Sequence, residues 1–276
     1  MKKQKRLLLL GDVLGVIATV IIFLVPFYFM FVQSLKSKAE ANKLSISWPG
    51  ELHWENYTEV FSHANYQLVT AFKNSGILTL FTVLGLLVTA AMAGYVIQRR
   101  HDKIVNGIQA VIMLGLMIPA AILPTIHLLQ TLHIYKTMFS MVMIEIALQT
   151  PFAIMLYRGY MASIPTELEE AARIDGCNRW QIFQDIIFPL LKPIQATLII
   201  LVGVQTFNDF TNPLYFLPGT ENTTVQLTLY NYKGQLASSY NLLFADIIVI
   251  TIPMLILFLL FNKRIVEGMV AGSVKG

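Results

Sequence analysis

The chain has 276 residues, of which 55% are hydrophobic and only 13% are charged, and its formal net charge at pH 7 is +4. A soluble domain of this size could hardly bury so much apolar surface, so the composition is typical of a protein with several membrane-spanning segments. The small positive charge has to be interpreted by position and gives no reason to expect nucleic-acid binding. The single cysteine, Cys177, excludes an internal disulfide.

The first predicted span is the apolar run over residues 7–32, which follows a cluster of basic residues. At about 1.5 Å per helical residue the run is long enough to cross a hydrocarbon core, and it is too long for the apolar region of a signal peptide. We therefore predict an uncleaved first span. Residues 33–74 are polar and form a predicted external loop, in which Trp54, Tyr57 and Phe61 recur at the spacing of an interfacial helix.

Two further spans follow in order. Residues 76–97 are uncharged and end at Arg99 and Arg100, and basic residues at the end of a span mark its cytoplasmic side. Residues 108–126 form the third predicted span, in which two prolines near the far end predict a kink.

The fourth predicted span, residues 138–157, contains Glu145 and Gln149. Ionisable groups at membrane depth are costly and usually face a bundle interior or a wet cavity. Two interpretations stay open: Glu145 lines a transport pathway, or its carboxyl group is hydrogen-bonded to a neighbouring helix and has a structural role.

A long polar segment, residues 165–189, follows the fourth span. Thr166 with Glu169 three positions later fits a capping box at the start of a short helix, and Gly176 fits a left-handed stop at its end. Asn178 is suited to cap a second helix. The segment therefore predicts a polar elbow of two helices joined at a glycine.

One face of the first elbow helix is predicted to dock against another surface. Leu168, Ala171, Ala172 and Asp175 share one helical face, and the two alanines permit close approach. A helix this short is not stable alone in water and needs a partner. The alternatives are a surface linker between two spans and a DNA-reading helix-turn-helix, which the absence of a soluble three-helix core argues against.

Glu170-Ala171-Ala172, Gly176 and Ile186-x-Phe188-Pro189 together resemble the EAA signature of permeases of binding-protein-dependent ABC importers, which usually has Leu at the position of Phe188. Arg-Ile-Asp-Gly at 173–176 is similar to the carbohydrate branch of that family. The resemblance implies that the elbow is a coupling helix that inserts into a cleft of a cytoplasmic ATPase subunit. The residues that it assigns to ATPase coupling are Glu169, Glu170, Ala171, Ala172, Arg173, Asp175, Gly176 and Pro189.

The fifth predicted span, residues 194–212, ends in a second motif. Its sequence from Phe207 to Leu214, Phe-Asn-Asp-Phe-Thr-Asn-Pro-Leu, resembles the Trp-Asn-Asp-Phe-x-x-Pro-Leu of sugar permeases. The candidate pathway residues are Glu145, Gln149, Asn208, Asp209 and Asn212.

Residues 212–240 form a predicted external loop with several aromatic residues. Aromatic faces suit the CH faces of sugars, but tyrosines at a membrane interface are the commoner cause of such a pattern. The resemblance implies that such a loop can reach into the binding protein. The candidate binding-protein contacts are Tyr215, Phe216, Tyr230 and Tyr232.

The sixth predicted span is residues 242–261, with Asp246 near its start. The tail after it is similar to the Gly-x-x-x-Gly-x-x-Lys-Gly ending of the family, which implies that Gly272 and Lys275 contact the ATPase. The resemblance as a whole implies an all-α integral membrane protein, a single permease domain over residues 1–276 with six transmembrane helices of the type I ABC importer fold. The basic residues place the elbow and both termini on the cytoplasmic side of the cell membrane.

The chain has no phosphate-binding loop and no zinc-protease motif, so it is not expected to hydrolyse ATP or to be an enzyme. The resemblance implies a permease subunit of an ATP-driven importer of sugars, in particular oligosaccharides, that works by alternating access. The implied partners are a second permease, two ATPase subunits that bind ATP and Mg, an extracytoplasmic sugar-binding protein and the lipid bilayer. No cofactor, metal or nucleic acid is expected on this chain.

Two alternatives stay open. A permease of the same family can import a glycerophosphodiester or another non-sugar solute, and the sequence does not name the substrate. A membrane-embedded enzyme would use Glu145, Asp209 and Asp246 as its acids, although nothing pairs them at a recognisable catalytic spacing.

Overall fold

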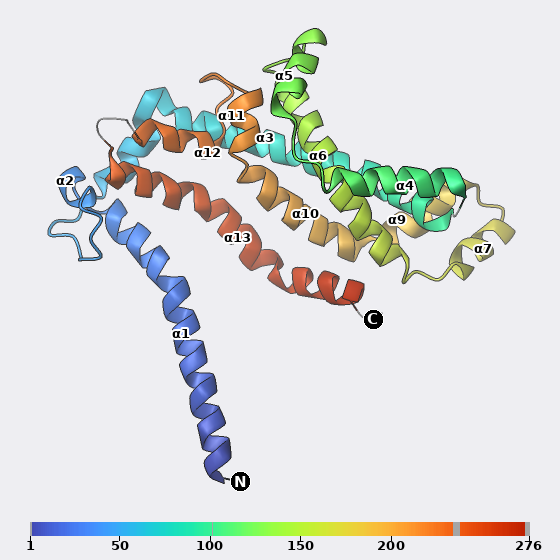
Figure 1. Ribbon diagram of the computed structural model, residues 1–276, viewed down its shortest axis with the longest axis horizontal. Coiled ribbons are helices and arrows are strands. Elements are labelled where there is room, and N and C mark those ends of the chain that lie inside the picture. The colour runs from blue at the N-terminus through green and yellow to red at the C-terminus, as the bar shows by residue number, and fades with distance from the viewer. Residues whose placement is uncertain (1, 101, 234–237, 274–276) are drawn as a thin grey trace. The chain divides into compact units, whose positions relative to one another are not determined.

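A computed structural model describes residues 2–100, 102–233 and 238–273, and the side chains of these residues at positions 12, 13 and 15–260. In this part of the chain the regular elements are helices, with one isolated bridge between Lys233 and Ser238 (Figure 1). The predicted all-helical class is therefore confirmed. The chain forms two compact units, the first of Met1–Val69 with Thr228–Ile252 and the second of Thr70–Leu227 with Pro253–Gly276.

The helices in chain order are α1 (Lys2–Ser34), α2 (Lys38–Ala41), α3 (Glu55–Arg99), α4 (Lys103–Gly115), α5 (Ile122–Thr131), α6 (Met138–Met161), α7 (Glu167–Ile174), α8 (Arg179–Gln181), the π-helix η1 (Ile182–Ile187), α9 (Phe188–Leu190), α10 (Lys192–Phe207), α11 (Thr211–Phe216), α12 (Val225–Thr228), the 3₁₀-helix η2 (Leu229–Tyr232) and α13 (Tyr240–Ser273).

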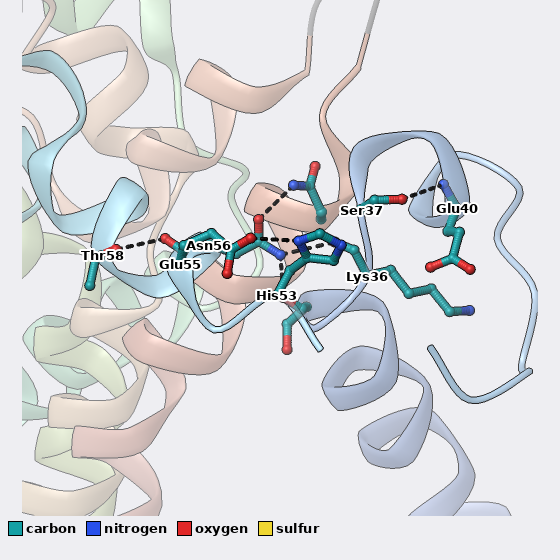
Figure 2. Close-up of polar contacts among 9 residues, drawn as sticks. Lys36, Ser37, Glu40, His53, Glu55, Asn56 and Thr58 are labelled. Atoms are coloured by element: carbon teal, nitrogen blue, oxygen red, sulfur yellow. Dashed lines mark hydrogen bonds and ion pairs between the residues drawn. The ribbon is translucent and has the colours of Figure 1, made fainter. Parts of the chain in front are cut away.

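In the first unit, the buried side chain of Asn56 ties three segments together. Its amide nitrogen donates to the carbonyl oxygens of Ser34, at 2.8 Å, and Lys36, at 3.0 Å, directly after α1. Its side-chain oxygen accepts a hydrogen bond of 2.8 Å from Asn241, in the first turn of α13. Figure 2 shows Asn56 among the polar contacts of this region. Phe29 and Phe244 add an edge-to-face contact with ring centroids 5.4 Å apart. These contacts hold the end of α1 against the start of α13.

Within the predicted external segment over 33–74, α3 begins at Glu55, where the spacing of Trp54, Tyr57 and Phe61 predicts an interfacial helix. The helix is interrupted at His63, whose ψ of 140° is extended, and at three consecutive residues with φ between 47° and 62°, Ala64, Asn65 and Tyr66. A left-handed conformation costs a non-glycine residue roughly 1–2 kcal/mol, so neighbouring contacts must hold this turn. One of them is the contact between the rings of His63 and Tyr232, 5.2 Å apart.

In the second unit, α6 and α10 pack side by side (Figure 1). Their buried apolar side chains, with those of α3, form the main core. Gly94 of α3 lets α6 approach closely, since a Cβ there would lie 3.0 Å from the Cβ of Tyr157. Any larger residue at position 94 would push the two helices apart.

The predicted third span over 108–126 is not one kinked helix. α4 ends at Gly115 and α5 begins at Ile122, with Pro119 in the break. Proline supplies no backbone N–H and restricts the dihedral angles of the residue before it. Pro119 therefore lies in a complete break between two helices, and not in a kink of one helix. At the start of α4, Asp102 accepts a hydrogen bond from the backbone N–H of Val105, which holds the pKa of that carboxyl below its usual range.

The predicted fifth span ends early. α10 stops at Phe207 rather than continuing to residue 212, and α11 begins at Thr211. The Asp209 side chain accepts hydrogen bonds from the backbone N–H groups of Thr211 and Asn212, at 2.9 and 3.2 Å. Asp209 therefore satisfies donors at the start of a new helix instead of continuing the old one.

Four helices in the described part of the chain are long and apolar enough to cross a membrane: Gly15–Ser34 of α1, Glu55–Arg99, Met138–Met161, and Tyr240–Leu260 of α13. Arg179–Leu190 and Lys192–Phe207 form a further candidate, bent by 70°. The chain is therefore a multi-pass membrane protein by the length and composition of its helices.

Candidate functional site

The first helix of the elbow, α7, has one inward and one outward side. Glu169 and Ala172 are buried, whereas Ile174 is 86% exposed and Leu168 is 43% exposed. The predicted docking face is therefore wrong at Ala172, which packs into the core of this chain. The outward side of α7 carries two large apolar side chains that the chain itself does not cover.

Glu169 anchors α7 to the last turns of α3. One oxygen of its carboxylate accepts a hydrogen bond of 2.7 Å from Nε of Arg99, and the other accepts one of 2.8 Å from the hydroxyl of Tyr95. Arg99 also donates to the carbonyl oxygen of Ile164, just before α7, at 3.0 Å. Hydrogen bonds between charged groups are stronger than those between neutral groups, so the contact of Arg99 with Glu169 fixes α7 against α3.

The predicted capping box at Thr166 is wrong, because Glu169 makes the contacts just described instead. Thr166 has helical dihedral angles and makes no capping hydrogen bond through its side chain. Its expected partner, Glu169, is occupied by Arg99, 70 residues away in sequence. A buried ion pair outweighs a local cap, which typically contributes only ~1 kcal/mol.

The turn after α7 is a Schellman motif. The N–H of Gly176 donates to the carbonyl oxygen of Arg173, at 3.1 Å, and the N–H of Cys177 donates to that of Ala172, at 3.0 Å. Gly176 has a φ of +88°, a conformation that favours glycine, so the predicted left-handed stop is confirmed.

The second helix of the elbow begins with a capping box. The side-chain oxygen of Asn178 accepts from the backbone N–H groups of Trp180 and Gln181, and the Gln181 side chain accepts from the Asn178 N–H in return. The predicted cap at Asn178 is therefore confirmed. Farther along, η1 widens the helix so that the N–H of Phe188 donates to the carbonyl oxygen of Phe183, immediately before Pro189. Such π segments recur at functional sites.

The structure places the predicted coupling residues in two groups. Glu169 and Ala172 face inward, and their side chains cannot contact a partner. The others lie on the surface of the elbow: Glu170, Ala171, Arg173, Asp175, Gly176 and Pro189. Of the predicted tail contacts, the side-chain surroundings of Gly272 and all of Lys275 lie outside the described residues.

A second candidate site is a polar cavity of about 300 Å³ in the same unit. It brings together all five predicted pathway residues, which come from α6, from the break after α10 and from α11. Gln205 and Leu148, which the sequence analysis missed, complete its wall. Gln205 stands two positions before the Phe207 motif, and extending that motif backwards along a helix could have found it. The lining residues are Glu145, Leu148, Gln149, Gln205, Asn208, Asp209 and Asn212.

We call this cavity the polar cavity. Amide side chains connect its two acidic residues, Glu145 and Asp209. The side-chain nitrogen of Asn212 lies 2.6 Å from an oxygen of Asp209 and 3.4 Å from one of Glu145, so the two carboxyl groups share one donor. The amide nitrogen of Gln149 donates to Glu145 at 2.9 Å and to the hydroxyl of Thr206 at 2.8 Å. Glu145 is thus hydrogen-bonded to neighbouring elements and also lines a cavity, and its place on a transport pathway stays a prediction.

The aromatic residues of the predicted external loop are only partly available. Phe216 and Tyr232 are buried, at 2% and 4% exposure, so neither side chain can contact a binding protein. Burial raises the pKa of Tyr232. Tyr215 and Tyr230 are exposed. In the described residues, no group of three or more His, Cys, Asp or Glu side chains could hold a metal ion.

Comparison with known proteins gives the family. A model of the binding-protein-dependent transport system inner membrane component family matches residues 82–270. The chain is 32% identical to the melibiose/raffinose/stachyose import permease protein MelC of Bacillus subtilis (strain 168), with 91% of each chain covered. It is 30% identical to the probable starch degradation products transport system permease protein AmyC of Thermoanaerobacterium thermosulfurigenes, with 95% of each covered.

A solved structure has the same fold. The chain superposes with a TM-score of 0.82 and 21% identity, covering 94% of this chain and 97% of the other, on a chain of a bacterial ABC transporter involved in the import of the acidic polysaccharide alginate. The family model covers well over half of the sequence, and its members are transport permease subunits and not enzymes. The chain therefore belongs to the family of binding-protein-dependent transport system inner membrane components.

Proposed function

We propose that this chain is one of two permease subunits of an ATP-driven importer that takes up oligosaccharides delivered by an extracytoplasmic binding protein. The observation that carries the proposal is the elbow, which combines an uncovered apolar side with a buried ionic anchor to a long apolar helix. Two relatives support a sugar as the solute: an import permease for melibiose, raffinose and stachyose, and a probable transport permease for starch degradation products.

The geometry of the elbow suits the transmission of movement. Leu168 and Ile174 present an apolar surface that a cleft of a partner ATPase would cover. Glu169 links the same helix to Arg99 of α3, so a displacement of α7 is passed to a helix long enough to cross the membrane. Movement of two such elbows, one on each permease, would switch the spans between inward-open and outward-open states. ATP and Mg belong to the ATPase subunits.

The proposed topology has six spans, with α4 and α5 together forming the third and α10 the fifth. Both termini and the elbow lie in the cytoplasm, because basic residues concentrate at the N-terminus, after α3 and near the C-terminus. The exposed side chains of Tyr215 and Tyr230 then lie outside, where a binding protein would dock. A relative of known structure was solved with its periplasmic binding protein, which supports this partner. We also assign Gly272 and Lys275 to an ATPase contact.

The docking surface can be tested with two arginine substitutions on α7. Ile174→Arg replaces an 86% exposed side chain, so the permease should keep its unfolding temperature while co-purification of the ATPase falls at least tenfold. Ala172→Arg forces a charge into the core of this chain and should destabilise the permease itself by several kcal/mol. Co-purification is measured after membrane extraction of the complete transporter.

The matched control is Asn106→Arg, which adds the same charge to an exposed position of α4 and should change neither measurement. Wild-type ATPase co-purification and transport in Ile174→Arg would rule out α7 as the coupling surface.

A further inference from the structure

We propose that the polar cavity is a solute site in this subunit that holds one neutral, hydroxyl-rich sugar residue and discriminates against anionic sugars. The inference rests on the proposed function for the assumption that the solute is a carbohydrate. Beyond that function, it states that this chain contacts the solute directly and that the contact accepts neutral solutes.

The first argument is an unpaired acceptor. Gln149 is 4% exposed and lines the cavity, and its amide nitrogen is fully used by Glu145 and Thr206. Its side-chain oxygen has no hydrogen-bond partner within the described structure. A buried acceptor without a donor is unfavourable, so a ligand with a hydrogen-bond donor would be stabilised here.

The second argument is the charge of the wall. Two of the lining residues, Glu145 and Asp209, carry carboxyl groups, and the lining residues include no lysine, arginine or histidine. Glu145 is 2% exposed, and its carboxyl group contacts the amides of Gln149 and Asn212 and the carboxyl group of Asp209. An anionic ligand would bring a further negative charge close to two acids without gaining a cation as partner. Sugar hydroxyl groups donate hydrogen bonds and add no charge.

The third argument is size and shape. A volume of about 300 Å³ is at the lower end of the range for ligand pockets and is sufficient for one sugar ring. Leu148 supplies an apolar patch for the CH face of a ring, while Gln205 and Asn208 can both donate to and accept from hydroxyl groups.

The test uses the assembled, purified transporter without its binding protein. Binding of maltotriose, a neutral probe, and trigalacturonate, an acidic probe of similar length, is measured by titration calorimetry. The near-isosteric variants Glu145→Gln and Asp209→Asn remove one acid each, and Gln149→Ala removes the free acceptor. We expect Gln149→Ala to weaken maltotriose binding about tenfold, and the two acid variants to shift the neutral-to-acidic affinity ratio at least tenfold toward trigalacturonate.

Gln130→Ala, an exposed position on α5, is the matched control and should bind both probes like the wild type. Unfolding temperatures of all variants are measured so that loss of fold is recognised. An unchanged affinity ratio in folded acid variants would overturn the proposal. So would saturable Ca²⁺ or Na⁺ binding that the same variants abolish, with no binding of maltotriose, because the cavity would then be a cation site.

Failure of the proposed function has a different signature. If the complete wild-type system, with its binding protein and ATP, imported no oligosaccharide into liposomes, the carbohydrate assignment itself would be wrong. Import with unchanged probe selectivity in the acid variants would contradict only the assignment of the polar cavity.

Discussion

Two glutamates are almost completely buried in the second unit, and their partners differ in kind. Glu169, 3% exposed, is bound by the guanidinium group of Arg99 and the hydroxyl of Tyr95. Glu145, 2% exposed, is contacted by the amides of Gln149 and Asn212 and shares the latter with Asp209. A cation contacts the first carboxyl group, and the contacts of the second come from amides and from the carboxyl group of Asp209.

The difference bears on the two proposed roles. Glu169 is bound by a cation and by the Tyr95 hydroxyl, so its contacts position α7 against α3. Glu145 instead lines the polar cavity, beside the unpaired side-chain oxygen of Gln149. The comparison supports the two proposals: force transmission by the elbow and solute contact at the polar cavity.

The largest effect should come from removing the cation of the first glutamate. Arg99→Ala leaves Glu169 buried with the longer ion pair to Arg173, at 3.8 Å, and breaking a buried ion pair from one side costs about 3 kcal/mol or more. The unfolding temperature of the permease in detergent should fall, and ATP hydrolysis should become uncoupled from transport, because α7 loses its link to α3.

Arg100→Ala is the matched control, since Arg100 is exposed and its ion pair with Asp102 lies at the surface. It should change stability by less than about 0.5 kcal/mol. An equal effect of the two substitutions would show that Glu169 does not depend on Arg99, and the contrast between the two glutamates would lose its basis.

An intermediate effect is expected at the turn that sets the angle between the elbow helices. Gly176→Ala places a side chain at a φ of +88° and should destabilise the elbow by roughly 1–2 kcal/mol, with reduced ATPase co-purification. Gly159→Ala, in open space within α6, makes the same chemical change at a helical position. It should be neutral or stabilising, because alanine is the better helix former. A neutral Gly176→Ala would mean that the turn is not held in its left-handed conformation.

The smallest effect should come from the cap of the second elbow helix. Asn178→Ala removes the acceptor for the N–H groups of Trp180 and Gln181 and should cost about 1 kcal/mol, measured by hydrogen exchange of those two amides. Thr166→Ala removes a residue that makes no cap and should leave the exchange rates in α7 unchanged. Faster exchange in α7 would show that Thr166 does cap the helix in solution.

The errors of the sequence analysis have two causes. The cap at Thr166 and the docking face through Ala172 were both predicted from residues a few positions apart, and both were displaced by packing against distant residues of α3, α6 and η1. The third and fifth predicted spans had the right composition and the wrong limits, because apolar composition does not state where a helix breaks. By contrast, Gly176 and Asn178 act on neighbours within three residues, and both were predicted correctly.

The sequence by itself determined the membrane class, the elbow with its glycine turn and second cap, and five of the seven residues that line the polar cavity. Composition, local hydrogen bonding and the cost of polar groups at membrane depth can all be read along the chain. Only the tertiary structure decided which carboxyl group has a cation. Arg99 and Glu169 are 70 residues apart, and the polar cavity joins α6 to residues about 60 positions later. Which partner a buried charge receives depends on helix packing, and no local pattern records it.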